Sequence, residues 1–432
     1  MPFSPFPSRS SPQPATVAPV TSAISAFVHW EASIAETTPF TFGVSGHEVV
    51  GAEGRNDPAL SEHFRRLGIR LVRLRCPGLI DRWANPLTSD WDETTVRESL
   101  SRADSFQVVL NLPLWPSWMR QDGDRLLHMG EHAAYARLCA RLVEMVNRRH
   151  RRRIVYWELM HELEERYRRA NRLTELWQLY NTLAVAMKRA DPSIRIGGPA
   201  FAAGDPQLLE AFLLHCRSHI DFVSWHDYLR CPLGEPGERL LAQAIEVRER
   251  LQAVKALVKT HLGERSVPLL IGECNIDRQP RCPAGRASER IDAVWLASVF
   301  KHLAEAGTDM VAFSHLKGDH LGLYTAAGRP RPVATVLGWF ARHLVGRVCR
   351  STVTHFAVES LAVRNREGQR AVLLINKSEE PVAVRLNDLT GREPVILDLA
   401  ADGSEVRGVL PRAIFERMPL PLAPLSLKLV LF

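Results

Sequence analysis

The sequence predicts an α/β protein in which a (β/α)₈ barrel, or TIM barrel, is followed by a C-terminal antiparallel β-sandwich domain. From residue 40 on, short runs rich in Val, Ile and Leu alternate with longer segments of helical apolar spacing, which is typical of parallel βα units. Past Gly346 this pattern changes to short alternating strands separated by Gly, Asn, Asp and Pro turns. A chain of 432 residues, 46% of them hydrophobic, can bury both cores.

The elements of the predicted barrel follow one another in strict alternation. Strands are predicted at Thr41–Val44, Ile69–Arg75, Gln107–Leu112, Ile154–Leu159, Arg195–Gly198, Phe222–His226, Pro268–Glu273 and Met310–Ser314. Amphipathic helices are predicted at Asp57–Leu67, Thr94–Ala103, Glu131–Arg149, Arg172–Ala190, Pro206–Cys216, Glu238–His261, Ser288–Ala306 and Pro332–Leu344. Eight strand–helix units match a closed barrel.

The predicted domains divide the chain into four parts. Residues 1–24 are rich in Pro and Ser and are predicted to form a disordered leader that lacks the apolar core of a secretory signal. Residues 25–39 contain a lone strand, which we expect to join the C-terminal sheet because a strand edge needs a partner. The barrel then covers residues 40–345 and the sandwich 346–432. Sandwich strands are predicted at His355–Arg364, Ala371–Asn376, Val382–Leu386, Val395–Asp398 and Ser426–Phe432.

The composition argues against a nucleic-acid site, a zinc site and a membrane-spanning segment. The formal net charge of +7 is carried mainly by arginines spread along the chain, so no nucleic-acid site is predicted. The seven cysteines form no C-x-x-C pair, which indicates a reducing compartment and no zinc site. No apolar run approaches the roughly 20 residues that span a bilayer. A cytoplasmic location is therefore the default expectation, and the oligomeric state is left open.

The candidate functional residues lie at the ends of the predicted strands. In such a barrel, polar residues at the C-terminal strand ends face the catalytic mouth, whereas residues in the strand middles are packed. The residues singled out by this rule are Arg73, Arg75, Trp115, His161, Glu162, His226, Tyr228, Glu273, Asn275 and His315.

Two glutamates among them form the candidate catalytic pair. Glu162 follows the fourth predicted strand and Glu273 ends the seventh, and each comes after an apolar run. An ionisable group in that place is costly unless it emerges at a polar site. Cleavage of a glycosidic bond requires one carboxylic acid to protonate the leaving oxygen and a second carboxylate to attack or to activate water. The pair has the right chemistry for these two roles.

The motifs around the pair resemble those of a known family. They are Leu67–Arg73, Asn111–Met119, Asp221–Tyr228 and His320–Pro332. With the two glutamates, their order and spacing resemble clan A glycoside hydrolases. They are most similar to family 39, which includes β-xylosidases, iduronidases and exopolysaccharide hydrolases. The resemblance covers about Phe40 to Leu344.

This resemblance implies retaining hydrolysis of an oligo- or polysaccharide, with Glu273 as nucleophile and Glu162 as general acid/base. It implies that Arg73 hydrogen-bonds the nucleophile, that His226 lies beside it and that Trp115 lines the sugar pocket. No metal or other cofactor is required. A bacterial exopolysaccharide, including an anionic one, is a candidate substrate.

Two departures from the family leave alternatives open. His161 stands where the family has an asparagine, and a histidine there is expected to titrate near neutral pH and to shift the pKa of the acid. The eighth strand, Met310–Ser314, lacks the family's platform tryptophan. A catalytically impaired carbohydrate-binding protein therefore remains an alternative, as does a transglycosylase or a lyase. His161 and Glu162 begin like the zinc-peptidase motif H-E-x-x-H, but the second histidine is missing.

Overall fold

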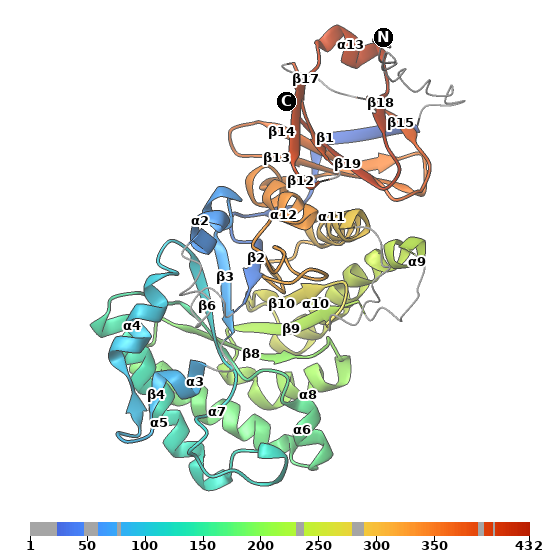
Figure 1. Ribbon diagram of the computed structural model, residues 1–432. Coiled ribbons are helices and arrows are strands. Elements are labelled where there is room, and N and C mark those ends of the chain that lie inside the picture. Colours follow the sequence, from blue (N-terminus) through green and yellow to red (C-terminus); the bar gives the residue numbers. More distant parts are fainter. Residues whose placement is uncertain are drawn as a thin grey trace, which may run out of the picture.

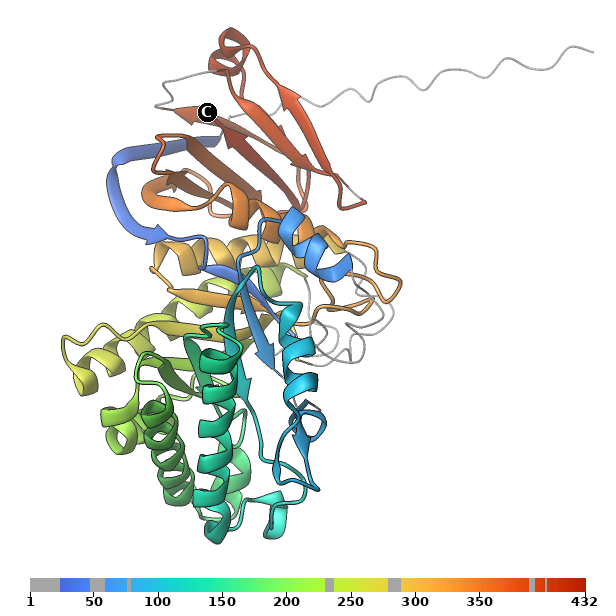
Figure 2. The same ribbon diagram turned by 90° about the vertical axis from the view of Figure 1, so that its left-hand side faces the viewer.

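The computed structural model describes residues 24–46, 59–75, 79–229, 237–278, 289–387, 393–400 and 402–432. It contains a barrel and a second domain built on one extended sheet, which packs against the outside of the barrel (Figures 1 and 2). The fold class predicted from the sequence is confirmed. The predicted leader, apart from Ile24, lies outside the described residues, as do Cys76, Cys231 and Cys282.

Eight parallel strands close the barrel in the order in which they occur along the chain. They are β2 (Phe42–Ser45), β3 (Leu71–Arg75), β6 (Gln107–Leu112), β7 (Tyr156–Leu159), β8 (Arg195–Phe201), β9 (Phe222–Tyr228), β10 (Leu269–Asn275) and β11 (Met310–Phe313). Each overlaps a strand predicted from the sequence. β11 pairs with β2, so no strand edge is left open.

Helices surround the barrel strands. The principal ones are α2 (Ala59–Arg66), α4 (Glu93–Ser101), α5 (His132–Val143), α7 (Leu173–Ala190), α8 (Pro206–Cys216), α10 (Glu246–Leu262), α11 (Glu289–Glu305) and α12 (Pro332–Arg342). Shorter segments are α3 (Leu79–Trp83), α6 (Glu164–Arg169), α9 (Gly237–Ala242) and the small hairpin of β4 (Ala84–Asn85) and β5 (Asp90–Trp91). The helix predicted at Glu238–His261 is divided into α9 and α10 by a 3₁₀ turn at Gln243–Ile245.

The second domain is a nine-stranded sheet to which both ends of the described chain contribute (Figure 1). Its strands run in the order β17 (Glu405–Val409), β16 (Val395–Leu399), β19 (Ser426–Leu431), β14 (Arg370–Asn376), β13 (Val358–Arg364), β12 (Gly346–Val353), β1 (Ile24–Thr37), β15 (Val382–Asn387) and β18 (Leu420–Leu422). β1 pairs antiparallel with β12 and parallel with β15. One apolar cluster gathers buried side chains from β1, β12–β16, β18, β19 and the short helix α13 (Arg412–Arg417), so the sheet encloses a core of its own.

Helix α11 joins the two domains. It packs against the barrel and also contacts β1, β13, β14 and β19. In β13, the partly buried Glu359 accepts hydrogen bonds from Ser298 and His302 of α11 and forms an ion pair with Lys377. These bonds fix the sheet to the side of the barrel.

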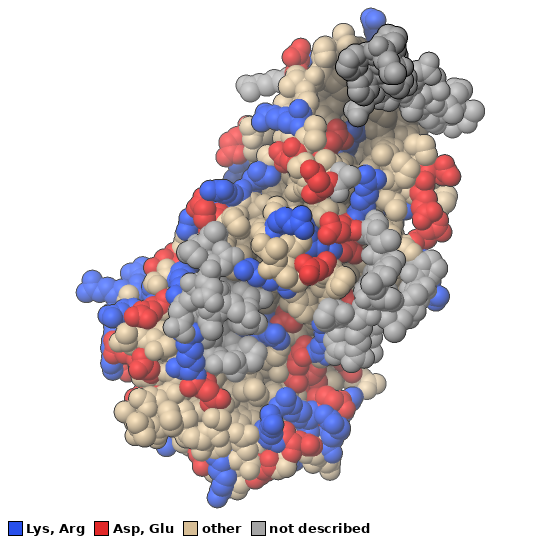
Figure 3. Space-filling model, viewed as in Figure 1, with Lys and Arg blue, Asp and Glu red and all other residues tan. Residues whose placement is uncertain are grey.

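The surface gives no sign of a single-sign charge patch on the face in Figure 3. There, lysines and arginines are interspersed with aspartates and glutamates. Among the described residues, no helix is long and apolar enough to cross a bilayer.

Candidate active site

Inside the barrel, the inward-facing side chains change from apolar to polar along the strands. The apolar layer near the strand starts consists of Leu71, Val109, Phe222, Leu270 and Met310, with Tyr156 packed against it. Because side chains in a strand alternate with a period of two, the next inward position carries Arg73 in β3, Asn111 in β6, Glu158 in β7 and Ser224 in β9. All four are almost completely buried. The polar layer is thus the floor of the catalytic mouth.

Arg73 is the fully buried cation at the centre of this layer. Its guanidinium lies 2.7 Å from Glu158 and 3.0 Å from Glu273, and it donates to the Ser45 hydroxyl at 3.0 Å. A buried charge is tolerated only when it is paired and hydrogen-bonded, and here one arginine pairs with two carboxylates. Gly272 makes room for it, because a Cβ at that position would lie 2.9 Å from Arg73 Nε.

Glu273 is held as a carboxylate from two sides. Its Oε1 faces Arg73 and lies 3.4 Å from Arg75 Nε, and its Oε2 accepts a 2.6 Å hydrogen bond from the Tyr228 hydroxyl. Burial by itself raises the pKa of Glu273, but His226, Arg73 and Arg75 together bring that pKa well below its usual value. Burial lowers the pKa of His226 to about 4, so this histidine is uncharged at neutral pH. At that pH the low pKa of Glu273 is therefore due to Arg73 and Arg75. Glu273 is therefore ionised at neutral pH.

The backbone after β7 projects Glu162 toward Glu273. Met160 and Glu162 have φ values of 71° and 52°, a left-handed conformation that is unfavourable for residues with a side chain. Neighbouring strands hold it: the Glu162 N–H donates to Ala200 O at 2.9 Å, and the Asn111 side chain donates to Met160 O at 2.7 Å. The strained turn directs the carboxylate into the mouth, where 19% of the side chain remains exposed.

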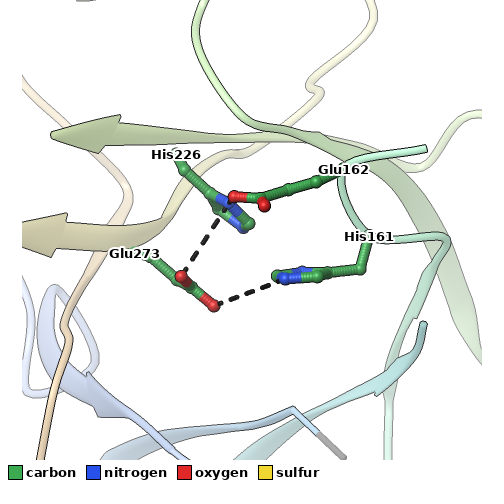
Figure 4. A group of neighbouring side chains, drawn as sticks. All are labelled: His161, Glu162, His226 and Glu273. Atoms are coloured by element: carbon green, nitrogen blue, oxygen red, sulfur yellow. Dashed lines mark hydrogen bonds and ion pairs between the residues drawn. The ribbon is translucent and has the colours of Figure 1, made fainter. Parts of the chain in front are cut away.

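The two carboxylates lie close together. His161, Glu162, His226 and Glu273 each offer one oxygen or ring nitrogen, and these four atoms lie within 4.8 Å of one another. Figure 4 shows the four side chains turned toward one common space at the strand ends. The strands that carry the two glutamates lie on different sides of that space, so a ring between them can be reached from both carboxylates.

His226 lies beside Glu273, as the family resemblance implies: the two residues are neighbours in the pairing of β9 with β10, and His226 Nδ1 lies 4.0 Å from Glu273. The hydrogen bond of this nitrogen, however, is to Glu162, at 2.8 Å. Tyr228 makes the hydrogen bond to Glu273 instead. His161 lies 2.8 Å from Arg75 through Nε2. Burial, and after it the nearby positive groups, hold the pKa of His161 well below its usual value, so the expected titration near neutral pH is wrong.

The same four residues have the donor types of a metal site. Zinc ligands hold the ion at about 2.0–2.3 Å, so their donor atoms lie closer together than the span found in this cluster. Arginines also contact Glu162, Glu273 and His161 and compete for the lone pairs that a cation needs. In this cluster, arginine guanidinium groups balance the charges of the two carboxylates.

The other predicted site residues have contacts with parts of the structure other than the two glutamates. Trp115 is buried in the core, with its ring against Tyr135. The Asn275 side chain donates to Leu321 O at 2.9 Å and to Ser314 O, which ties β10 to the loop after β11. The ring of His315 lies 6.2 Å from that of Tyr228.

Two residues of the site were not predicted from the sequence: Glu158, which pairs with Arg73, and Arg278, which contacts Glu162. Glu158 is a charge within the apolar fourth strand, and its burial cost could have identified it. Arg278 lies three residues beyond β10, and its guanidinium contacts Glu162 Oε2. Nothing in the local sequence distinguishes Arg278 from the many surface arginines of this chain.

Comparison with known proteins finds family matches over parts of the chain. Residues 141–317 match the model for Glycosyl hydrolases family 39, and residues 357–427 match the C-terminal immunoglobulin-like domain of D-apionate lactonase. A beta-xylosidase of Geobacillus stearothermophilus is 29% identical over 150 residues, which are 33% of this chain and 29% of that protein. The chain thus aligns with under a third of the length of this curated relative. The family 39 match spans both glutamates and confirms the resemblance that the motifs indicate.

Solved structures agree on the fold. The family 39 enzyme from Xanthomonas axonopodis pv. citri superposes with a TM-score of 0.70 at 16% identity, over 95% of this chain and 98% of that one. The family 51 alpha-L-arabinofuranosidase from Thermotoga petrophila has the same TM-score at 12% identity, over 95% and 100% of the two chains. At these identities the likeness concerns the fold alone.

Proposed function

We propose that this family 39-like clan A chain is a retaining glycoside hydrolase with Glu273 as nucleophile and Glu162 as general acid/base. The observation that carries the proposal is the proximity of the two carboxylates, one oxygen of each lying within 4.8 Å of the other. Retaining enzymes hold their carboxyl groups about 5–5.5 Å apart, whereas inverting enzymes leave about 6.5–9.5 Å for a water molecule. The spacing supports direct attack by Glu273.

In the first step Glu273 attacks the anomeric carbon while Glu162 gives its proton to the leaving oxygen. The contacts of Arg73, Arg75 and Tyr228 favour this role, because they keep Glu273 ionised and aimed into the mouth. In the second step Glu162 removes a proton from water, which attacks the same carbon and releases Glu273. The substrate is an oligo- or polysaccharide, and the site residues supply all of the chemistry.

The test begins with a screen of nitrophenyl α- and β-glycosides, followed by ¹H NMR of the anomer first released from the best substrate. Retention supports the proposal, and inversion contradicts it. Glu162→Gln is expected to lower kcat by about 10²–10⁴-fold on a substrate with a sugar leaving group, the usual contribution of a general acid. Glu273→Gln is expected to lower it at least as far.

Glu165→Gln serves as the matched control, because Glu165 lies three residues after Glu162 on α6 but is half exposed and pairs with Arg168. It is expected to retain wild-type activity. Full activity of Glu273→Gln on a cleaved substrate would remove the assignment of the nucleophile.

Sugar binding without turnover is a second candidate, favoured by the contact between Arg278 and Glu162, which stabilises the charged form of the acid. Calorimetry that detects oligosaccharide binding, together with no hydrolysis of any glycoside in the screen, would favour it.

A further inference from the structure

Both oxygens of Glu162 are occupied in the free protein. Oε1 accepts from His226 Nδ1 at 2.8 Å, and Oε2 is in contact with the guanidinium of Arg278. Of the three arginines around the carboxylates, Arg278 is the most exposed: its side chain is 44% exposed, compared with 30% for Arg75 and 0% for Arg73. Arg278 is therefore the arginine that a ligand can reach most directly.

This contact conflicts with the role of Glu162. A general acid must carry a proton when the glycosidic bond breaks, but a guanidinium against its carboxylate favours the charged form. The charged and titratable groups around Glu162 in the described residues are His226, Glu273, His161, Glu164, Arg73, Arg75 and Arg278. Arg278 contacts Glu162 itself, whereas Arg73 and Arg75 contact Glu273 and His161.

We propose that Arg278 forms a subsite for an acidic leaving sugar, and that the carboxylate of a uronic acid bound there draws Arg278 away from Glu162. The inference rests on the proposed function. The carboxylate takes the place of Glu162 as partner of the guanidinium, and the freed Glu162 accepts a proton from solvent. That proton then passes to the leaving oxygen as the glycosidic bond breaks, and the carboxylate of the sugar is unchanged.

The position of Arg278 places the subsite on the leaving side. The acid oxygen of Glu162 must face the glycosidic oxygen, and the sugar beyond that oxygen is the one that departs. A group that contacts Glu162 from the exposed side, away from the buried Arg73, therefore lies next to the departing sugar. Planar guanidinium groups bind carboxylates in a two-pronged manner, which suits a uronic acid.

The charges nearby also favour an anion. Burial lowers the pKa of Arg278, and the positive charge of Arg75 lowers it further. Two guanidinium groups that repel each other gain from an anion that pairs with one of them. A neutral leaving sugar carries no charge that could pair with Arg278. The ion pair between Arg278 and Glu162 therefore remains when such a sugar binds.

The experiment compares two disaccharides that share the glycone identified by the nitrophenyl screen and carry either glucose or glucuronic acid in the leaving position. Wild-type protein is expected to have at least a tenfold higher kcat/KM for the acidic one. In Arg278→Gln this preference is expected to disappear, and Arg278→Lys is expected to restore part of it. Arg168→Gln is the control, because Arg168 is an exposed, ion-paired arginine on α6.

The pH profile provides a readout that a purely structural role would not change. Opposite charges this close shift a carboxyl pKa by about 1–3 units, so loss of Arg278 is expected to move the basic limb of kcat/KM for a neutral substrate upward by about 1 unit or more. An unchanged basic limb, or an acidic-to-neutral ratio that is the same in Arg278→Gln and wild type, would overturn the inference. Hydrolysis of no glycoside at all would instead refute the proposed function on which it rests.

Discussion

Replacement of Tyr228 by Phe is expected to slow the release of the sugar from Glu273 more than its capture. The hydroxyl of Tyr228 donates to Glu273 Oε2 at 2.6 Å, and burial, together with the charge of Glu273, raises the pKa of Tyr228 well above its usual value, so the donor stays protonated. Glu273 loses its charge when the glycosyl-enzyme forms and regains it when the intermediate breaks down. The hydrogen bond therefore strengthens in the second step.

A hydrogen bond to a charged group contributes about 1.5–3 kcal/mol. At about 1.36 kcal/mol per tenfold change in rate, its loss slows breakdown of the intermediate by about 10–150-fold. If breakdown limits turnover, kcat and KM fall together and kcat/KM changes little, because kcat/KM reports the first step.

The assay is steady-state and stopped-flow kinetics on the best nitrophenyl glycoside, with mass spectrometry of the quenched protein. A burst of nitrophenol and a glycosylated Glu273 peptide are expected. Tyr135→Phe is the matched control, since Tyr135 is buried and donates one 2.6 Å hydrogen bond, to Leu114 O, with no contact to either glutamate. A fall in kcat/KM at constant KM would refute this reasoning and place Tyr228 in the first step.

Two further predictions concern packing and pH. Gly272→Ala is expected to lower kcat at least tenfold and to cause a modest loss of stability in thermal unfolding. The reason is that the new Cβ displaces Arg73 from Glu158 and Glu273, the two carboxylates with which it pairs. A wild-type kcat in this variant would show that Arg73 can move without cost. Glu359→Gln is expected to lower Tm at neutral pH and to flatten the loss of stability below about pH 4.3, the usual carboxyl pKa. Burial raises the pKa of Glu359, but His302 and Lys377 help to hold it well below its usual value, so its contribution is present above that pH and is lost as the pH falls. A Tm profile that is parallel to that of the wild type in acid would contradict this.

The barrel could be predicted because each of its strands is buried on both faces. Continuous apolar runs such as Leu269–Ile271 leave few alternative structures, and the helices between them carry clear amphipathic spacing. The strands of the second domain were harder to predict from the sequence. β12 (Gly346–Val353) and β17 (Glu405–Val409) were not among the predicted strands, because β12 carries arginines on its outer positions and β17 is exposed throughout. Their pairing partners, and not their own residues, define them.

The positions of the two glutamates followed from the strand ends, and the family resemblance implied the contact between Arg73 and Glu273, but the partners of Glu162 were not predicted. Whether His226 bonds Glu162 or Glu273 depends on a difference of about one ångström set by the strained turn at Glu162. Arg278 reaches Glu162 from a loop, where side-chain direction depends on a backbone path that local sequence does not determine.

The position of β1 has a consequence for how the chain is made. Its partners, β12 and β15, are synthesised only after the whole of the barrel sequence. Until then Ile24–Thr37 carries two unsatisfied strand edges, a known hazard for association between nascent chains. A shortened chain that starts at the barrel would lack the strand between β12 and β15, so the C-terminal sheet is complete only when this N-terminal segment is included.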